Sequence, residues 1–184
     1  MLAAEKDTTT RAVVFSASGT TFCAGNDVND FMKENGAVPA LRFIQTLARF
    51  TKPIVAAVQG PAVGVGATML LHCDLVYASE AARLHMPFVS MALVPEAASS
   101  LLLPRRVGHA VAAEMILLGA PIDAKRAVEV GLVNRVVASE ELREHALGRA
   151  RELAKKPPNA LRVSRDLLRG DLRDVERRIA EEAE

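Results

Sequence analysis

The sequence contains little cysteine, almost no net charge and no long apolar run. Its two cysteines, Cys23 and Cys73, form neither a CxxC pair nor a Cys/His ligand pattern, so we expect reduced, packed thiols and no metal site. Its 23 basic and 22 acidic residues nearly cancel, which argues against nucleic acid or an anionic membrane surface as a partner. No window reaches the roughly 18 apolar residues of a membrane span, and the first residues lack the apolar region of a signal peptide. These absences predict a cytoplasmic protein that does not enter a membrane.

Half of the residues are hydrophobic, which is enough for one sizeable core. Short β-branched runs alternate with segments of helical periodicity, a pattern typical of an α/β fold with a parallel sheet. The expected strands are Arg11–Ser16, Pro53–Val58, Asp74–Ser79 and Val133–Val137. The expected helices are Ala40–Phe50, Ala67–His72, Ala124–Val130, Glu140–Lys155, Asn159–Leu168 and Asp171–Glu184. We therefore expect a core over residues 1–138 and a C-terminal helical region over residues 139–184, whose amphipathic end could pack on another subunit.

Glycine-containing loops follow two of the expected strands. The first is Phe22–Val28, and the second is Gly60–Gly66, which leads into the next expected helix. Backbone N–H groups at such turns are left unpaired by the sheet, and together they could stabilise a negatively charged oxygen. The alternative is that glycine only allows strand and helix to pack closely here. The spacing GxxxGxG differs from the GxGxxG dinucleotide fingerprint, and the loop lacks the lysine of a P-loop.

Four ordered motifs carry a resemblance to a known family. They read FCAGNDV, QGPAVGVGATMLLHCDLVYAS, HMPFVSMALVPEAASSLLLPRRVG and PPNALRVSRDLLRG. Together they resemble the crotonase superfamily of enoyl-CoA hydratases and isomerases over roughly Arg11 to Gly170. Within that superfamily the chain is most similar to peroxisomal-type Δ3,Δ2-enoyl-CoA isomerases and to bacterial relatives labelled enoyl-CoA hydratase. The resemblance implies a crotonase-like (ClpP/crotonase) ββα spiral with a helical C-terminal trimerisation region.

The resemblance also implies what the protein binds and where. The substrate would be an acyl-CoA thioester, with no separate cofactor, and the assembly a homotrimer or a dimer of trimers. The backbone amides of Asn26 and Val65 would form an oxyanion hole for the thioester carbonyl. Loss of one such donor typically costs about 3 kcal/mol of transition-state stabilisation. The remaining substrate-binding positions would be Ala24, Gly25, Asp27, Val28 and Gly64.

The choice of reaction depends on carboxylates, because an oxyanion hole stabilises an enolate but moves no proton. Hydratases that resemble this chain use two glutamates, and Thr68 and Phe88 stand at those positions here. Glu96 stands where the peroxisomal-type isomerases place a single catalytic glutamate. Its apolar neighbours would raise its pKa by desolvation, whereas a helix N-terminus would lower it. The alternative is that Glu96 is only an acid in the first turn of a helix after Pro95.

Other polar residues are weaker candidates. His72 sits among apolar residues of its expected helix and is best interpreted as a packed, hydrogen-bonded core histidine. His85 could face the acyl pocket. Ser99 has no ordered His and Asp partners, so a serine triad is not expected. Arg105 and Arg106 are expected on a solvated face.

We therefore expect Δ3-to-Δ2 double-bond migration, in which Glu96 removes a proton from C2 of the acyl group and returns it to C4. A hydratase, or another acyl-CoA reaction that uses Glu96 with an unrecognised partner, is the first alternative. A scaffold that binds CoA esters or RNA without turnover is the second. Family members usually begin some tens of residues before Arg11 and extend further at the C-terminus. The resemblance therefore implies a chain that is short at both ends, with CoA binding impaired if the upstream segment is missing.

Overall fold

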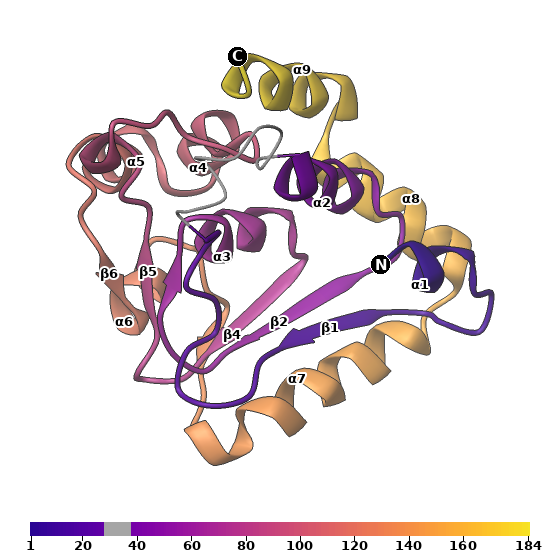
Figure 1. Ribbon diagram of the computed structural model, residues 1–184. Coiled ribbons are helices and arrows are strands. Elements are labelled where there is room, and N and C mark those ends of the chain that lie inside the picture. The colour runs from indigo at the N-terminus through magenta and orange to yellow at the C-terminus, as the bar shows by residue number, and fades with distance from the viewer. Residues whose placement is uncertain (28–37) are drawn as a thin grey trace.

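The computed structural model describes residues 1–27 and 38–184 (Figure 1). Val28, which was expected among the substrate-binding residues, lies outside this part of the chain. The strands are β1 Val13–Ser16, β2 Ile54–Val58, β3 Ala62–Val63, β4 Leu75–Ala78, β5 Arg83–His85, β6 Ile122–Asp123 and β7 Arg135–Val136. The helices are α1 Leu2–Lys6, α2 Val38–Arg49, α3 Val65–Thr68, α4 Ser99–Val107, α5 His109–Leu117, α6 Ala124–Glu129, α7 Ser139–Ala154, α8 Pro158–Arg169 and α9 Leu172–Glu182. Two 3-10 helices, η2 Met69–His72 and η3 Val89–Met91, complete the described elements.

The larger sheet has the strand order β1-β2-β4-β7, and every neighbouring pair is parallel. Val13 pairs with Ile54 and Val55 with Leu75, so β2 is the central strand of the first three. All five residues of β2 are buried, which explains why its sequence is continuously apolar rather than alternating. The four expected strands of a parallel sheet are confirmed. Each observed strand is one to three residues shorter than the strand expected from the sequence.

A second, smaller sheet has the order β3-β5-β6. β3 and β5 are parallel, whereas β5 and β6 are antiparallel. Only the segment around β5 has a strand-like sequence, because β3 and β6 contain two residues each and show no periodicity. The small sheet matters for the site because β3 ends at Val63, directly before Gly64.

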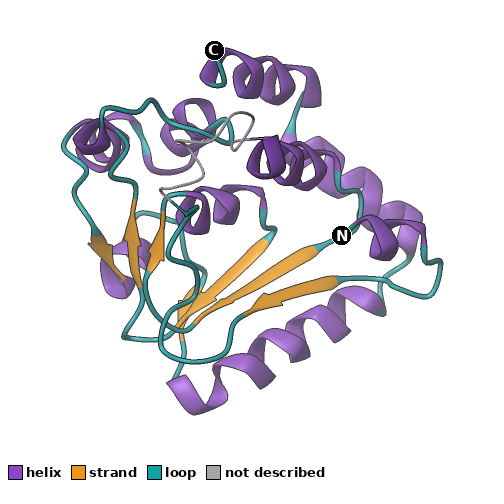
Figure 2. Cartoon of the chain, in the orientation of Figure 1, coloured by secondary structure: helices purple, strands orange, loops and turns teal. Residues whose placement is uncertain are grey.

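Helices cover both faces of the larger sheet (Figure 2). α7 lies along one face, where its buried Leu142, Ala146 and Ala150 pack against Val55 and Tyr77. On the other face, α2 and the helical turns after β3 pack with β2 into the main core. The sheet is therefore a middle layer, and the loops that leave its strands emerge beside α2 and α3.

The C-terminal helices are fastened to this core by specific contacts. On α8, the buried Arg165 donates to both carboxylate oxygens of Asp74 at 2.7 and 2.8 Å and to the Phe50 carbonyl at 2.6 Å. On α9, Val175 and Ile179 pack against α2. The expected helical C-terminal region is confirmed, while trimerisation and a division at residue 138 stay predictions. No helix in the described ranges is long and apolar enough to cross a membrane.

Candidate active site

The two glycine loops lie side by side because backbone hydrogen bonds join them. The Phe22 amide donates to the Pro61 carbonyl at 3.0 Å, and the Val63 amide donates to the Cys23 carbonyl at 2.9 Å. Cys23 also forms an isolated parallel bridge with Ala62. The first loop therefore lies alongside β3, and the two loops make their turns next to each other.

Each loop turns at a glycine with a left-handed backbone. Gly25 has φ +97°, and a Cβ there would lie 3.3 Å from the Val63 carbonyl oxygen. Gly64 has φ +53°, and its amide donates to the His85 carbonyl at 2.9 Å. A residue with a side chain would be strained at both positions. Gly25 therefore does allow close packing of the backbone, as the alternative interpretation expects. The same turns also leave the amides of the following residues accessible.

The amides that follow the turning glycines are those of Asn26 and Val65. In the part of the chain that the structure describes, neither N–H group donates a hydrogen bond to a protein acceptor. Val65 is the first residue of α3, where an N–H group has no intrahelical partner. Two unpaired donors at adjacent turns can bind one ligand oxygen between them.

Glu96 faces these loops from the segment between η3 and α4. A Cβ at Gly64 would lie 4.0 Å from Glu96 Oε1. α4 begins only at Ser99, so the alternative in which Glu96 is an acid in the first helical turn is wrong. Ala97 and Ala98 adopt left-handed backbone angles, with φ +61° and +56°. This turn separates Glu96 from the first residue of α4.

Burial decides the charge state of Glu96. Desolvation raises its pKa to about 7, and the charge of Glu182 adds to the rise. Of the two opposing effects expected from the sequence, desolvation therefore dominates, because no helix starts at this residue. A carboxyl group with this pKa can both accept and return a proton near neutral pH.

The loops and Glu96 line one cavity of about 680 Å³. Ala24, Gly25, Asn26, Gly64 and Val65 all contribute to it, whereas the exposed Asp27 is not among its lining residues. Most of the remaining wall is apolar and comes from α2, from the segment around η3 and from α9. The cavity therefore combines an apolar wall with a small number of polar groups, as ligand sites usually do.

The other residues considered from the sequence fall outside this role. Thr68 is fully buried, and the buried Phe88 lines the cavity with an aromatic ring. His72 is buried, and its Nε2 lies 2.8 Å from the Ala97 carbonyl oxygen, so the expected core histidine is confirmed. Desolvation lowers the pKa of His72 to about 4, which keeps its ring neutral. His85 is not among the cavity-lining residues.

Both cysteines are free thiols, as expected. Burial raises the pKa of Cys73 to about 12, so this thiol is not a nucleophile near neutral pH. Within residues 1–27 and 38–184, no group of three or more His, Cys, Asp or Glu side chains is placed to hold a metal ion. That the reaction needs no metal or other cofactor stays a prediction.

One cavity-lining carboxylate has no sequence signal that singles it out. Glu182 of α9 accepts hydrogen bonds from the Ala98 amide at 2.6 Å and from the Ser100 amide at 3.0 Å. The Ser100 hydroxyl donates to the same carboxylate at 2.6 Å. Burial raises the pKa of Glu182, and the hydrogen bonds from Ser100 and Ala98 oppose that rise. In sequence, Glu182 is one of many charged residues on a surface helix.

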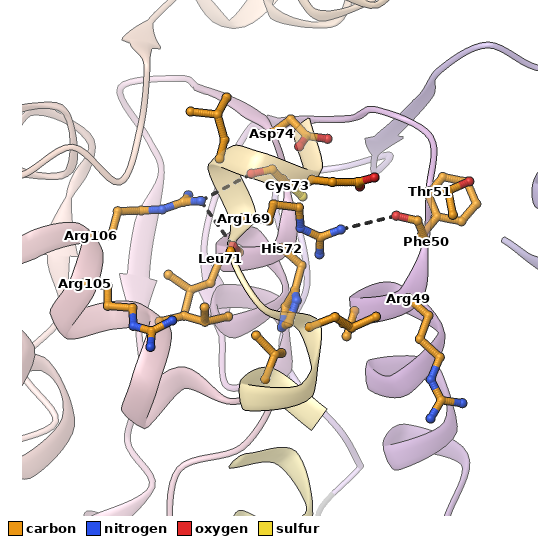
Figure 3. A pocket seen from close by; sticks show the side chains of 17 residues that line it. Arg49, Phe50, Thr51, Leu71, His72, Cys73, Asp74, Arg105, Arg106 and Arg169 are labelled. Carbon is orange, nitrogen blue, oxygen red and sulfur yellow. Dashed lines mark hydrogen bonds between the residues drawn. The ribbon is translucent and has the colours of Figure 1, made fainter. Parts of the chain in front are cut away.

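A second cavity, of about 650 Å³, lies between α2, α4, α8 and α9 (Figure 3). Arg106 donates to the carbonyls of Leu71 and Cys73, and Arg169 donates to that of Phe50. The expectation that Arg106 lies on a solvated face is confirmed by its exposed side chain, although its guanidinium group also donates to backbone carbonyls of the helical turns beneath it. Arg105 is half exposed and also fits the expectation.

The comparisons with known proteins agree with this geometry. The family model described as enoyl-CoA hydratase/isomerase matches residues 1–183. This chain belongs to the enoyl-CoA hydratase/isomerase family. The crotonase resemblance inferred from the four motifs is thereby confirmed, and so is the α/β class. A crystal structure of an enoyl-CoA hydratase/isomerase from Pseudoalteromonas atlantica T6c superposes with a TM-score of 0.94 at 45% identity, over 99% of this chain and 74% of that one.

Curated members of the family include isomerases. "Enoyl-CoA delta isomerase 2" of Rattus norvegicus is 39% identical over 85% of this chain and 42% of its own length. "1,2-epoxyphenylacetyl-CoA isomerase" of Escherichia coli K12 is 38% identical over 83% of this chain and 62% of its own length. The chain thus spans less than two thirds of these curated relatives.

Proposed function

We propose that the protein catalyses Δ3-to-Δ2 double-bond migration in an enoyl-CoA thioester. The observation that carries this proposal is the position of Glu96, a carboxyl group with a pKa of about 7 beside the two turns that expose unpaired amides. The family membership supports an acyl-CoA substrate. The isomerases among the curated relatives support the type of reaction.

In the proposed reaction, the thioester oxygen accepts hydrogen bonds from the amides of Asn26 and Val65. The ionised Glu96 removes a proton from C2, and the electron pair moves into the carbonyl to give a dienolate. The two amides stabilise the negative oxygen, each contributing about 3 kcal/mol or more in comparable sites. The protonated Glu96 then returns the proton to C4, so that the double bond moves from C3–C4 to C2–C3. No proton is gained or lost overall.

The apolar wall contributes to this chemistry in two ways. It accommodates an acyl tail, and it keeps water away from the dienolate, which would otherwise be protonated at random. It also raises the pKa of Glu96 by desolvation, which makes the carboxylate a stronger base. The apolar wall therefore both binds the acyl tail and makes Glu96 a better base.

Hydration is the second candidate, because Glu182 places another carboxyl group in the same cavity. A hydratase must hold a water molecule between two acid/base groups. Here the Glu182 carboxylate already accepts three hydrogen bonds from Ala98 and Ser100, which leaves it little freedom to activate water. This arrangement favours isomerisation over hydration.

The test incubates the protein separately with a 3-enoyl-CoA and a 2-enoyl-CoA. We expect the 3-enoyl substrate to be isomerised and the 2-enoyl substrate to gain water far more slowly. Glu96→Gln should lower kcat for isomerisation on the order of a thousandfold, because removal of a positioned base costs about 10² to 10⁴ in rate. The exposed Glu80→Gln, which removes the same charge far from the cavity, is the matched control.

Three results would contradict the proposal in different ways. Equal rates on the two substrates would favour a hydratase. Full activity in Glu96→Gln would remove Glu96 from the mechanism. Tight binding of both thioesters without turnover, measured by calorimetry, would favour a binding scaffold.

A further inference from the structure

The segment that carries Glu96 is held from two sides, by the half-buried Glu182 and the buried His72, which are distant from it in sequence. From α9, the Glu182 carboxylate accepts hydrogen bonds from the Ala98 and Ser100 amides. From η2, His72 Nε2 lies 2.8 Å from the Ala97 carbonyl. A carbonyl oxygen can only accept, so Nε2 carries the proton and donates to it. Both contacts fall within four residues of Glu96.

The held segment has a backbone conformation that its residues do not favour. Ala97 and Ala98 are consecutive left-handed residues with φ +61° and +56°. Their Cβ atoms make this conformation unfavourable, and it persists only where surrounding contacts fix it. The hydrogen bond from the Ala98 amide to Glu182 is such a contact, at 2.6 Å and with an acceptor that is charged when ionised.

The same carboxylate also faces Glu96 as a charge. Burial raises the pKa of Glu182, but its three hydrogen bonds and the charge of Arg178, which donates to the Ser100 hydroxyl, oppose that rise. Within the described residues, burial and the charge of Glu182 set the charge state of Glu96, and no hydrogen bond adds to them. We therefore expect Glu182 to ionise at lower pH than Glu96, and its charge then disfavours the ionised form of Glu96.

Among the described residues, the other titratable and charged groups considered around Glu96 come from α9 and η2. α9 and the residues after it supply Arg178 and Glu184, of which Glu184 lines the cavity. η2 supplies His72, which is neutral and reaches the segment only through the Ala97 carbonyl. Glu182 is the group whose charge raises the pKa of Glu96.

We infer that Glu182 is a positioning residue for the general base: it fixes the left-handed turn that aims Glu96 at the glycine loops, and it places a second carboxylate beside that base. This inference rests on the proposed function, because it assigns Glu96 the role of base. It makes α9 part of the site, since the docking of this helix fixes the direction of a residue 86 positions earlier in the chain and adds to the rise of its pKa.

The test measures the ionisation of Glu96 directly, by ¹³C NMR titration of glutamate side-chain carboxyl groups, with the Glu96→Gln spectrum for assignment. In the wild-type protein the Glu96 midpoint should lie near pH 7. In Glu182→Gln it should move to lower pH, and the ascending limb of the pH profile of kcat/KM should move with it. Amide hydrogen exchange at Ala98 and Ser100 should become faster. Glu176→Gln, which removes a charge from the same helix at its Arg49 contact, should leave the midpoint unchanged.

An unchanged Glu96 midpoint in a folded Glu182→Gln protein would overturn the inference. If that variant does not fold, the wild-type titration decides the matter alone: Glu182 must titrate at lower pH than Glu96, and the reverse order would overturn the inference. The NMR midpoints do not depend on turnover. A protein with the expected midpoints that isomerises no 3-enoyl-CoA would therefore contradict the proposed function and leave the coupling between the two carboxyl groups intact.

Discussion

Two cavities lined by described residues are nearly equal in size, at about 680 and 650 Å³, yet they differ in what their polar groups do. In the arginine-lined cavity of Figure 3, guanidinium groups donate to backbone carbonyls and are thereby occupied. In the Glu96 cavity, two amides have no protein acceptor within the described ranges, and one carboxyl group has a pKa displaced toward neutrality. Volume therefore does not identify the site, whereas unpaired polar groups that face an apolar space do.

His72 forms part of the wall between the two cavities. It lines the arginine cavity, and it is hydrogen-bonded to Ala97, which lines the other. The arginine cavity is thus a supporting structure, because it holds the backbone behind the segment that carries Glu96. Substitutions in the Glu96 cavity should therefore affect turnover, and substitutions in the arginine cavity should affect stability.

After removal of the base itself, the largest effect is expected at the turn of the first glycine loop. Gly25→Ala should lower kcat/KM for isomerisation about a hundredfold, because a Cβ at φ +97° and 3.3 Å from the Val63 carbonyl displaces the amide of Asn26. Steady-state kinetics on a 3-enoyl-CoA measures it. Gly148→Ala is the control, since a Cβ in the middle of α7 meets nothing within 4 Å. A Gly25→Ala enzyme with wild-type kcat/KM would show that this amide is not a donor in the transition state.

A smaller effect, on stability rather than on rate, is expected in the arginine cavity. Arg106→Met should lower the free energy of unfolding by about 1 kcal/mol, because the carbonyls of Leu71 and Cys73 lose a side-chain donor. Urea denaturation measures this loss, and kcat per folded molecule should be unchanged. Arg105→Met should stay within about 0.5 kcal/mol, because Arg105 is half exposed and its nearest carboxylate oxygen is 3.8 Å away. A large loss of kcat in folded Arg106→Met would show that the arginine cavity takes part in catalysis and is not only a support.

The smallest effect concerns the pH dependence of stability. Folding raises the pKa of Glu96 from 4.5 to about 7, so in this window the folded protein keeps a proton that the unfolded chain releases. The free energy of unfolding therefore falls as pH rises from 4.5 to 7. Between these two values the wild-type protein should lose on the order of 1 kcal/mol more than Glu96→Gln, a figure reduced for partial exposure. Denaturation curves at both pH values measure this difference. Equal losses in the wild-type protein and in Glu96→Gln would show that the pKa of Glu96 is not raised on folding.

Much of the fold could be predicted because its signals are local. The central strand β2 is apolar without interruption, and α2 has helical spacing, so each was expected within two residues of its observed ends. β3 and β6 were missed because two-residue strands are defined by their partners and not by their own sequence. The register that joins the first glycine loop to β3 is a tertiary feature of the same kind.

The site divides in a similar way. The turning glycines and Glu96 belong to motifs that can be read along the chain, and the structure places them in one cavity. Glu182 could not be found in this way, because its role depends on how α9 docks against α2 and α4. The sequence left the charge state of Glu96 open for the same reason. Desolvation is a property of the assembled cavity, and no stretch of residues encodes it alone.

The hydrogen bonds from Ala98 and Ser100 to Glu182 have a consequence for the order of folding. They join positions more than 80 residues apart, so the turn at Ala97 and Ala98 can be completed only after the sheet, α8 and α9 have come together. During synthesis from the N-terminus, the glycine loops emerge long before the carboxylate that steadies the base. In a refolding experiment, catalytic activity should accordingly return later than the circular dichroism of the helices.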